Sequence, residues 1–204
     1  FVIDYPGFRG PMPNYVRVMI ALFCQDLTIS IFFQMQYASD RSHLSLLILS
    51  MAFLSGLIYF IETIIVIQLP EDAGLTHTLK TNDTAVFYFF RQLSFIFLLG
   101  LAVWVEKHTA RRRFTLRNKV WLALISLIPL VMFPVLAHAL SSYNPTWTLT
   151  IAAYRPDQYH PVWDVRYVNA LIVLWSALAC YMTYVTRFSS GVWNSIIVVC
   201  LSAI

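Results

Sequence analysis

Residues 43–68, which read HLSLLILSMAFLSGLIYFIETIIVIQ, determine the class of fold. The stretch is predominantly apolar, and its one acidic or basic side chain apart from the terminal histidine is that of Glu62. A helix that crosses the hydrocarbon core of a bilayer needs about 20 mostly apolar residues. The stretch therefore predicts a transmembrane helix.

The composition of the whole chain agrees with this prediction. Of its 204 residues, 59% are hydrophobic and only 12% are charged, whereas soluble domains carry about 25% charged residues. So few charges cannot cover the surface of a soluble enzyme, and a disordered chain would contain far fewer apolar residues. We therefore expect a polytopic membrane protein.

Six apolar runs are candidates for membrane-spanning helices. The runs are Asn14–Tyr37, His43–Gln68, Thr84–Glu106, Lys119–Ser142, Tyr167–Phe188 and Val192–Ile204. The last is shorter than a full span, so we interpret it as a truncated sixth helix. The expected fold class is all-α, with one polytopic transmembrane helical bundle over residues 1–204. Continuous runs argue against a β-barrel, and the lack of an evident internal repeat weakens the case for a transporter.

The connection between the third and fourth runs sets the orientation. It holds six of the chain's 14 basic residues, namely Lys107, Arg111, Arg112, Arg113, Arg117 and Lys119. Basic loops stay in the cytoplasm, so this end of the bundle is predicted to be cytoplasmic. The same side chains could also contact anionic lipid, although orientation alone would account for them. These residues explain the positive net charge of the chain without nucleic-acid binding.

This orientation has a consequence for the parent protein. Phe1 falls outside, and the run that ends at Ile204 heads outward. A parent chain with both ends in the cytoplasm would then have about eight spans.

Three ionisable side chains fall inside the expected spans: Asp26, Glu62 and Arg91. Charges inside a membrane mark ligand or proton sites, but an acid and a base can also act as structural glue. At 1.5 Å per residue, Glu62 and Arg91 both lie about 10 Å below the outer surface, on neighbouring helices. We therefore predict an ion pair or a shared network between Glu62 and Arg91. Asp26 lies near the middle of its span and is either protonated or paired with Arg91.

Four more residues complete the set of candidate ligand- or signal-sensing residues. They are Gln92, His138, Asn169 and Trp163. Amide side chains inside a bundle more often bond to a neighbouring helix than to a ligand. No two histidines show the i, i+4 spacing of a metal site on one helix, so we expect no metal site.

The longest outer connection, residues 143–166, predicts a small hairpin outside the bundle. Residues 146–151 alternate with period two, as strands do, and residues 155–158 (RPDQ) form a turn signal. Residues 159–165 can return as the second strand. The aromatic rings of this hairpin could cap a ligand pocket or rest at the membrane interface.

Motifs for catalysis are not found in the sequence. It contains no Gly-rich phosphate loop, no HExxH and no GxSxG. The tripeptide Asn82-Asp83-Thr84 matches a glycosylation acceptor, which is a short pattern with many false matches. We therefore name no catalytic residue and no cofactor in this chain.

Several hydrophobic motifs, in order along the chain, resemble those of a known family. They are YVRVMIALF at 15–23 followed by Asp26, LSMAFLSGLIYF at 49–60, FRQLS at 90–94, AHALSS at 137–142, and Trp193-Asn194. Together they resemble the bacterial membrane-associated sensor (MASE) domain of the fourth class. That domain forms the N-terminal part of certain diguanylate cyclases, and the resemblance extends over nearly all of the chain.

The resemblance implies a sensory input module in the bacterial inner membrane. It implies a cytoplasmic GGDEF domain beyond residue 204, which condenses two GTP molecules into cyclic di-GMP with Mg²⁺. The implied partners are the lipid bilayer, a second copy bound through the helices and the cyclase domain, and an unknown small ligand or partner protein. The alternative is a non-catalytic membrane scaffold or partner-binding subunit.

Overall fold

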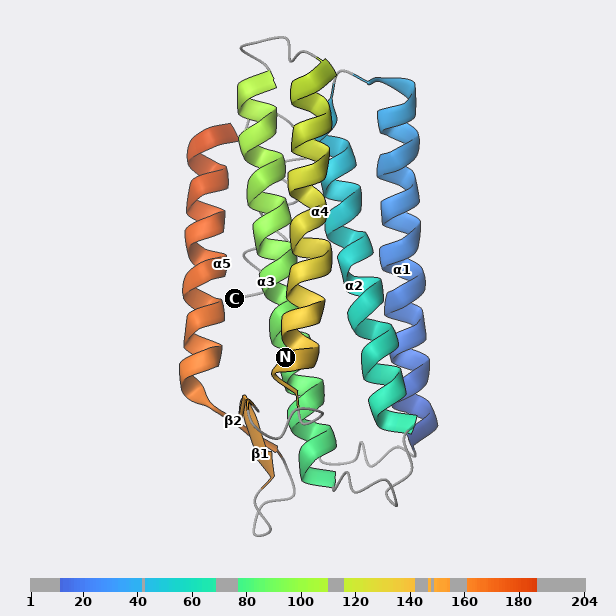
Figure 1. The fold of residues 1–204 in the computed structure, drawn as a ribbon, viewed down its shortest axis with the longest axis vertical. Coiled ribbons are helices and arrows are strands. Elements are labelled where there is room, and N and C mark those ends of the chain that lie inside the picture. The colour runs from blue at the N-terminus through green and yellow to red at the C-terminus, as the bar shows by residue number, and fades with distance from the viewer. Residues whose placement is uncertain are drawn as a thin grey trace.

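The computed structural model describes residues 12–41, 43–68, 77–109, 116–141, 147, 149–154 and 161–186. Within these residues the chain forms five long helices and one short pair of strands (Figure 1). The elements are α1 (Met12–Ser39), α2 (Leu44–Gln68), α3 (His77–Thr109), α4 (Leu116–Ala139), β1 (Ala152–Tyr154), β2 (Pro161–Trp163) and α5 (Val165–Thr186). The helical bundle expected from the sequence is confirmed.

Successive helices run in opposite directions, so the connections between them gather at two ends. We call the end that holds the α1–α2 and α3–α4 connections the basic end, at the top of Figure 1. The opposite end, which holds β1 and β2 and the start of α5, is called the sheet end.

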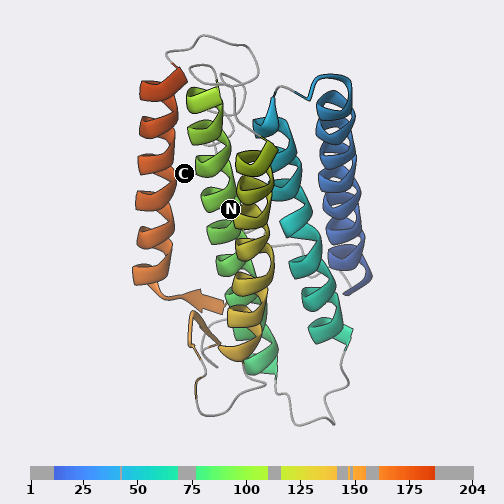
Figure 2. The ribbon, with the colours of Figure 1, turned by 45° about the horizontal axis from the view of Figure 1, so that its top comes forward.

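Helix α3 is the central element of the bundle. It packs against α2, α4, α5 and β1, whereas α1 packs mainly against α2 (Figure 2). Figures 1 and 2 show α1 and α5 at opposite edges of the bundle. Helix α1 is therefore connected to α5 through α2 and α3.

Two apolar clusters hold the helices together. The larger contains Leu49, Leu99 and Met182 from α2, α3 and α5, and small residues such as Ala52 and Ala102 let the backbones approach. The smaller lies toward the sheet end, where Phe87 packs with Ile151 and other buried residues. Close packing around small residues is the usual way in which helices associate in membranes, where lipid competes with apolar contacts.

Among the residues that the structure describes, four helical segments are long and apolar enough to cross a membrane. They are Leu44–Ile65, Asn82–His108, Val120–Ala139 and Val165–Val185. Helix α1, whose sequence contains Gln25, Asp26, Gln34 and Gln36, is not among these segments. The run Val192–Ile204, interpreted above as a truncated sixth span, lies outside the described residues.

Strands β1 and β2 pair antiparallel, with Ala153 opposite Val162. The second strand lies within the range 159–165 that the sequence predicted, but the predicted first strand at 146–151 is wrong. Pairing begins only at Ala152, because the backbone just before it bonds to other elements. The Leu149 N–H donates to the Leu140 carbonyl at 2.8 Å, and Asn82 holds residues 149–152 as described below.

Candidate functional site

An ion pair joins the first and third helices within the bundle. Arg91 Nη2 on α3 donates to Asp26 Oδ2 on α1 at 2.9 Å. The Asp26 and Arg91 side chains are 15% and 25% exposed, respectively. A charge in this environment is costly unless it is paired, so each side chain stabilises the ionised form of the other.

The pair crosses α2 at Gly56. A Cβ atom at this position would lie 2.7 Å from Asp26 Oδ2 and 3.2 Å from Arg91 Nε. Any other residue would therefore force the carboxylate or the guanidinium to move. The glycine makes room for two side chains from different helices to meet across a third.

The aromatic ring of Phe60 forms one wall of the site. It lies one helical turn after Gly56 on α2, and Arg91 Cζ is 4.3 Å from its centroid. The Phe60 side chain is buried, so this cation–π contact is shielded from solvent. The guanidinium thus has an aromatic face on one side and a carboxylate at its edge.

Two further polar residues continue the inner face of α1. Asp26, Ser30 and Gln34 are spaced i, i+4 and i+8, which places them on one side of the helix. Ser30 Oγ and Gln34 Nε2 both lie within hydrogen-bond distance of Ser50 Oγ on α2, at 2.9 and 3.0 Å. We call these three α1 residues the polar stripe.

The outer face of α1 has the opposite character. The side chains of Ile31, Phe32 and Met35 are 47%, 55% and 66% exposed. An apolar outer face and a polar inner face suit a helix that faces lipid. The hydrogen bonds of the polar stripe with Ser50 and the ion pair with Arg91 join α1 to α2 and α3 in a defined register.

The predicted ion pair between Glu62 and Arg91 is wrong, and the alternative partner Asp26 is the one observed. Glu62 Oε2 lies 4.0 Å from His138 Nδ1 on α4 instead. Counting residues along the helix predicts the depth of Glu62 in the bundle, but not the side of α2 on which its side chain lies. Six residues after Gly56, Glu62 is rotated by about 120° around α2, away from the Arg91 side.

The other candidate sensing residues are distributed over the bundle. Gln92 is half-buried beside Arg91 on α3, whereas Asn169 is exposed on α5, at the edge opposite α1. Trp163 belongs to β2, and its side chain lies outside the described ones. The structure therefore brings His138 to Glu62, and it does not gather all the candidates at one site.

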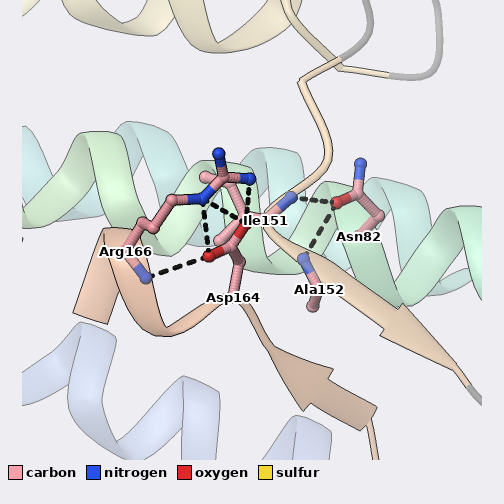
Figure 3. A network of polar contacts seen from close by, with 5 residues as sticks. All are labelled: Asn82, Ile151, Ala152, Asp164 and Arg166. Carbon is pink, nitrogen blue, oxygen red and sulfur yellow. Dashed lines mark hydrogen bonds and ion pairs between the residues drawn. The ribbon is translucent and has the colours of Figure 1, made fainter. Parts of the chain in front are cut away.

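A second polar network lies at the sheet end, around the buried side chain of Asn82 (Figure 3). Asn82 Nδ2 donates to the Leu149 carbonyl at 2.8 Å. Its Oδ1 accepts from the backbone N–H groups of Ile151 and Ala152, at 2.8 and 3.2 Å. Because the amide of Asn82 is buried and hydrogen-bonded, it is not accessible for glycosylation, although the tripeptide matches the acceptor pattern.

The same network continues to the start of α5 (Figure 3). The Asp164 N–H donates to the Ile151 carbonyl at 2.8 Å. The Asp164 carboxylate accepts from the Arg166 backbone N–H at 2.9 Å and from its guanidinium, Nη2 to Oδ2 being 2.6 Å. These hydrogen bonds from Arg166 hold the pKa of Asp164 below its usual value of 3.8. We call the contacts from Asn82 to Arg166 the loop clamp, because they tie α3, β1 and α5 together.

At the basic end, the connection between α1 and α2 is tied to α3. Ser45 Oγ donates a hydrogen bond to Glu106 Oε2, and His43 Nδ1 lies 3.4 Å from Glu106 Oε1. Of the basic residues expected to contact lipid, Lys107 is described with its side chain. Arg111, Arg112 and Arg113 lie outside the described residues, as do the side chains of Arg117 and Lys119. Within the described part of the chain, no group of three or more His, Cys, Asp or Glu side chains could hold a metal ion.

Sequence reasoning missed several residues that build these sites: Ser30, Ser50, Gly56, Phe60 and the clamping role of Asn82. The contact of Gln34 with Ser50 agrees with the expectation that amide side chains inside the bundle bond to a neighbouring helix. The i, i+4, i+8 spacing of Asp26, Ser30 and Gln34 was a usable signal, because polar residues on one side of an apolar helix indicate a helix–helix contact. No comparable pattern in the sequence indicated which helix this stripe would contact, or that Gly56 would leave space for the ion pair.

Two comparisons with known proteins found matches. A family model described as "Membrane-associated sensor, integral membrane domain" (MASE4) matches residues 13–204. The protein named "Probable diguanylate cyclase DgcT" of Escherichia coli (strain K12) is 36% identical over 205 residues. That alignment covers 98% of this chain and 45% of the relative, so the chain spans less than half the length of the relative. No solved structure matches the chain.

Proposed function

The chain belongs to the MASE4 family of integral-membrane sensor domains, and on that premise we propose that it is the input module of a membrane-bound diguanylate cyclase. The similarity to the probable cyclase of Escherichia coli over nearly the whole chain supports this proposal. The cyclase activity itself would belong to a cytoplasmic GGDEF domain beyond residue 204. That domain would use GTP and Mg²⁺ and would act as a homodimer.

The ion pair between Asp26 and Arg91 is the observation that carries the proposed mechanism. It binds α1 to the rest of the bundle at the position where Gly56 leaves room. A signal that competes for either charge would release this contact and shift the population of α1 positions. Helix α3 would then transmit the shift, because it packs against both α2 and α5.

The proposed topology places α1 and residues 192–204 in the membrane with the four apolar segments. The basic end would face the cytoplasm, in agreement with the positive-inside rule. The strand pair β1–β2 would then form the outer hairpin and lie over the outer mouth of the bundle. The loop clamp supports a role in signalling for this hairpin, because it connects β1 to both α3 and α5.

The proposed sensing residues follow from the same contacts. Asp26 and Arg91 form the centre, with Gln92 beside them. Glu62 and His138 form a second pair between α2 and α4. The signal would be a small ligand or a partner protein, and an anionic group on it would compete with Asp26 for the guanidinium of Arg91.

The proposal is tested with the full-length protein in nanodiscs. We expect it to convert GTP to cyclic di-GMP when Mg²⁺ is present, with the product measured by mass spectrometry. A variant of the GGDEF motif provides the inactive control. A full-length protein that continues into a different output domain, or that makes no cyclic di-GMP, would favour the alternative of a non-catalytic membrane scaffold.

A further inference from the structure

Four side chains gather where α3 and α5 end at the same level of the bundle. The apolar segments of these helices finish at His108 and Val185. Lys107 and Tyr184 approach each other there, with Lys107 Nζ 5.4 Å from the centroid of the Tyr184 ring. Trp104 and His108 are spaced i, i+4 and therefore lie on one face of α3, and Trp104 is three residues before Lys107. We call Trp104, Lys107, His108 and Tyr184 the end cluster.

The aromatic side chains of the end cluster are open to the surroundings. Tyr184 is 72% exposed and Trp104 is 40% exposed. The ring centroids of Trp104 and His108 lie 4.3 Å apart, and the planes of the two rings are inclined at 32° to each other. His108 Nδ1 donates to the Trp104 carbonyl at 2.7 Å, because a carbonyl oxygen can only accept. The Nε2 edge of this imidazole is therefore turned away from the helix backbone.

The acidic neighbour of the cluster is engaged elsewhere. Glu106 precedes Lys107 in the chain, but its carboxylate accepts from Ser45 and lies near His43 at the α1–α2 connection. The ion pairs that the structure gives Glu106 therefore do not include Lys107. In the sequence, three arginines follow at 111–113, and Arg187 follows Tyr184 closely.

These features together match the chemistry of a lipid headgroup. Tryptophan and tyrosine rings concentrate at the membrane–water interface, where their polar edges meet the headgroups. Each basic residue near an anionic membrane surface adds a favourable contribution to binding. An anionic phospholipid offers a phosphate for Lys107 and acyl chains for the exposed apolar surface of α3 and α5.

We propose that the end cluster is a binding site for the headgroup of an anionic phospholipid between α3 and α5. The inference rests on the membrane placement given under the proposed function, but not on any cyclase output. A lipid bound there would hold the ends of α3 and α5 together at the point where α5 approaches its last residues.

The test uses native mass spectrometry of the purified full-length protein in detergent. Phosphatidylglycerol and phosphatidylcholine are added in equal amounts, and the ratio of the two retained lipids is measured. We expect the wild-type chain to retain phosphatidylglycerol preferentially and Lys107→Gln to lower the ratio by about fivefold. Lys107→Arg, which keeps the charge, should retain most of the preference.

The matched control is Arg41→Gln, which removes one positive charge at the same end but outside the cluster. An unchanged lipid ratio is expected for this variant. If Lys107→Gln keeps the wild-type ratio, the proposed site is wrong. If Arg41→Gln lowers the ratio equally, the lipid preference comes from the general positive charge of this end, and the proposed site is also wrong.

A second pair of variants tests the aromatic part independently. Tyr184→Leu should lower the lipid ratio more than Tyr184→Phe, because only leucine removes the ring. Soluble glycerol 3-phosphate should not displace the retained lipid, since it lacks acyl chains. Displacement by this compound would show that the cluster recognises free phosphate and would overturn the lipid assignment.

Discussion

Arg91 on α3 reaches Asp26 on α1 by crossing α2 at Gly56, with 2.9 Å between Nη2 and Oδ2. The two residues are far apart in the sequence, and a third helix lies at their meeting point. Their contact depends on a missing side chain as much as on the two charges. The position of α1 is therefore coupled to α3 at this crossing point.

Gly56→Ala should disrupt this crossing. The new Cβ would lie 2.7 Å from Asp26 Oδ2, and such overpacking costs about 1–3 kcal/mol. Thermal unfolding in detergent should show the loss of stability. The control is Gly100→Ala on α3, where the Cβ would meet Leu178 Cδ1 at 3.5 Å, an ordinary contact. Equal stability losses in the two variants would contradict the special role of Gly56.

A double-mutant cycle should reveal the coupling between Asp26 and Arg91. Removing one partner of a fully buried pair costs about 3–5 kcal/mol of stability. Both side chains here are partly exposed, so each single variant should lose no more than that. We expect Asp26→Leu/Arg91→Leu to lose less free energy of unfolding than the sum of the two single variants. The measurement is equilibrium unfolding of all four proteins in the same detergent. Strictly additive losses would mean that the two residues act independently.

Asn82→Ala should loosen the loop clamp while the bundle remains intact. The variant leaves the backbone N–H groups of Ile151 and Ala152 without their acceptor, at a cost of about 1–3 kcal/mol. Hydrogen exchange at these two amides should accelerate, whereas exchange in the core of α2 should not. Asn82→Asp keeps an acceptor oxygen for these two amides, so their exchange should accelerate less than in Asn82→Ala. Unchanged protection at residues 151 and 152 in Asn82→Ala would refute the clamp.

The contact between Asp164 and Arg166 at the start of α5 should depend on pH only under strongly acidic conditions. Hydrogen bonds from Arg166 lower the pKa of Asp164 in the folded chain below 3.8. A carboxyl group with a lowered folded pKa contributes stability above its unfolded pKa, and this contribution is lost as the pH falls through the folded pKa. The ¹³C shift of the Asp164 carboxyl carbon should therefore titrate below pH 3.8, and Arg166→Gln should raise the midpoint. A midpoint at or above 3.8 in the wild-type chain would contradict this contact between Asp164 and Arg166.

The helices themselves could be predicted from the sequence because long apolar runs have few alternatives. The run at 43–68 and α2 differ by one residue at the start. The strands were harder, since β1 begins at Ala152 rather than within 146–151. Local alternation indicates a strand, but the capture of residues 149–152 by Asn82 depends on a distant helix. Such long-range contacts leave no periodic pattern in the sequence.

The partner of Arg91 shows the same limit for the candidate site. The residues in the bundle that carry charge were identifiable, because Asp26, Glu62 and Arg91 stand out in apolar runs. Residue counting then placed Glu62 and Arg91 at one depth, but helix rotation turns Glu62 toward His138. Only the arrangement of three helices around Gly56 selects Asp26. Gly56 can be read in the sequence, but nothing in the sequence shows that Asp26 and Arg91 meet at this position.

The role of the Asp26–Arg91 contact in signalling is tested most directly by the cyclic di-GMP content of cells that produce the full-length protein. Because Arg91→Leu and Gly56→Ala both release Asp26 from Arg91, both should change this content in the same direction at equal amounts of protein in the membrane. Gly100→Ala should leave the cyclic di-GMP content unchanged. A wild-type cyclic di-GMP content and an unchanged signal response in Arg91→Leu, at normal expression, would contradict the account.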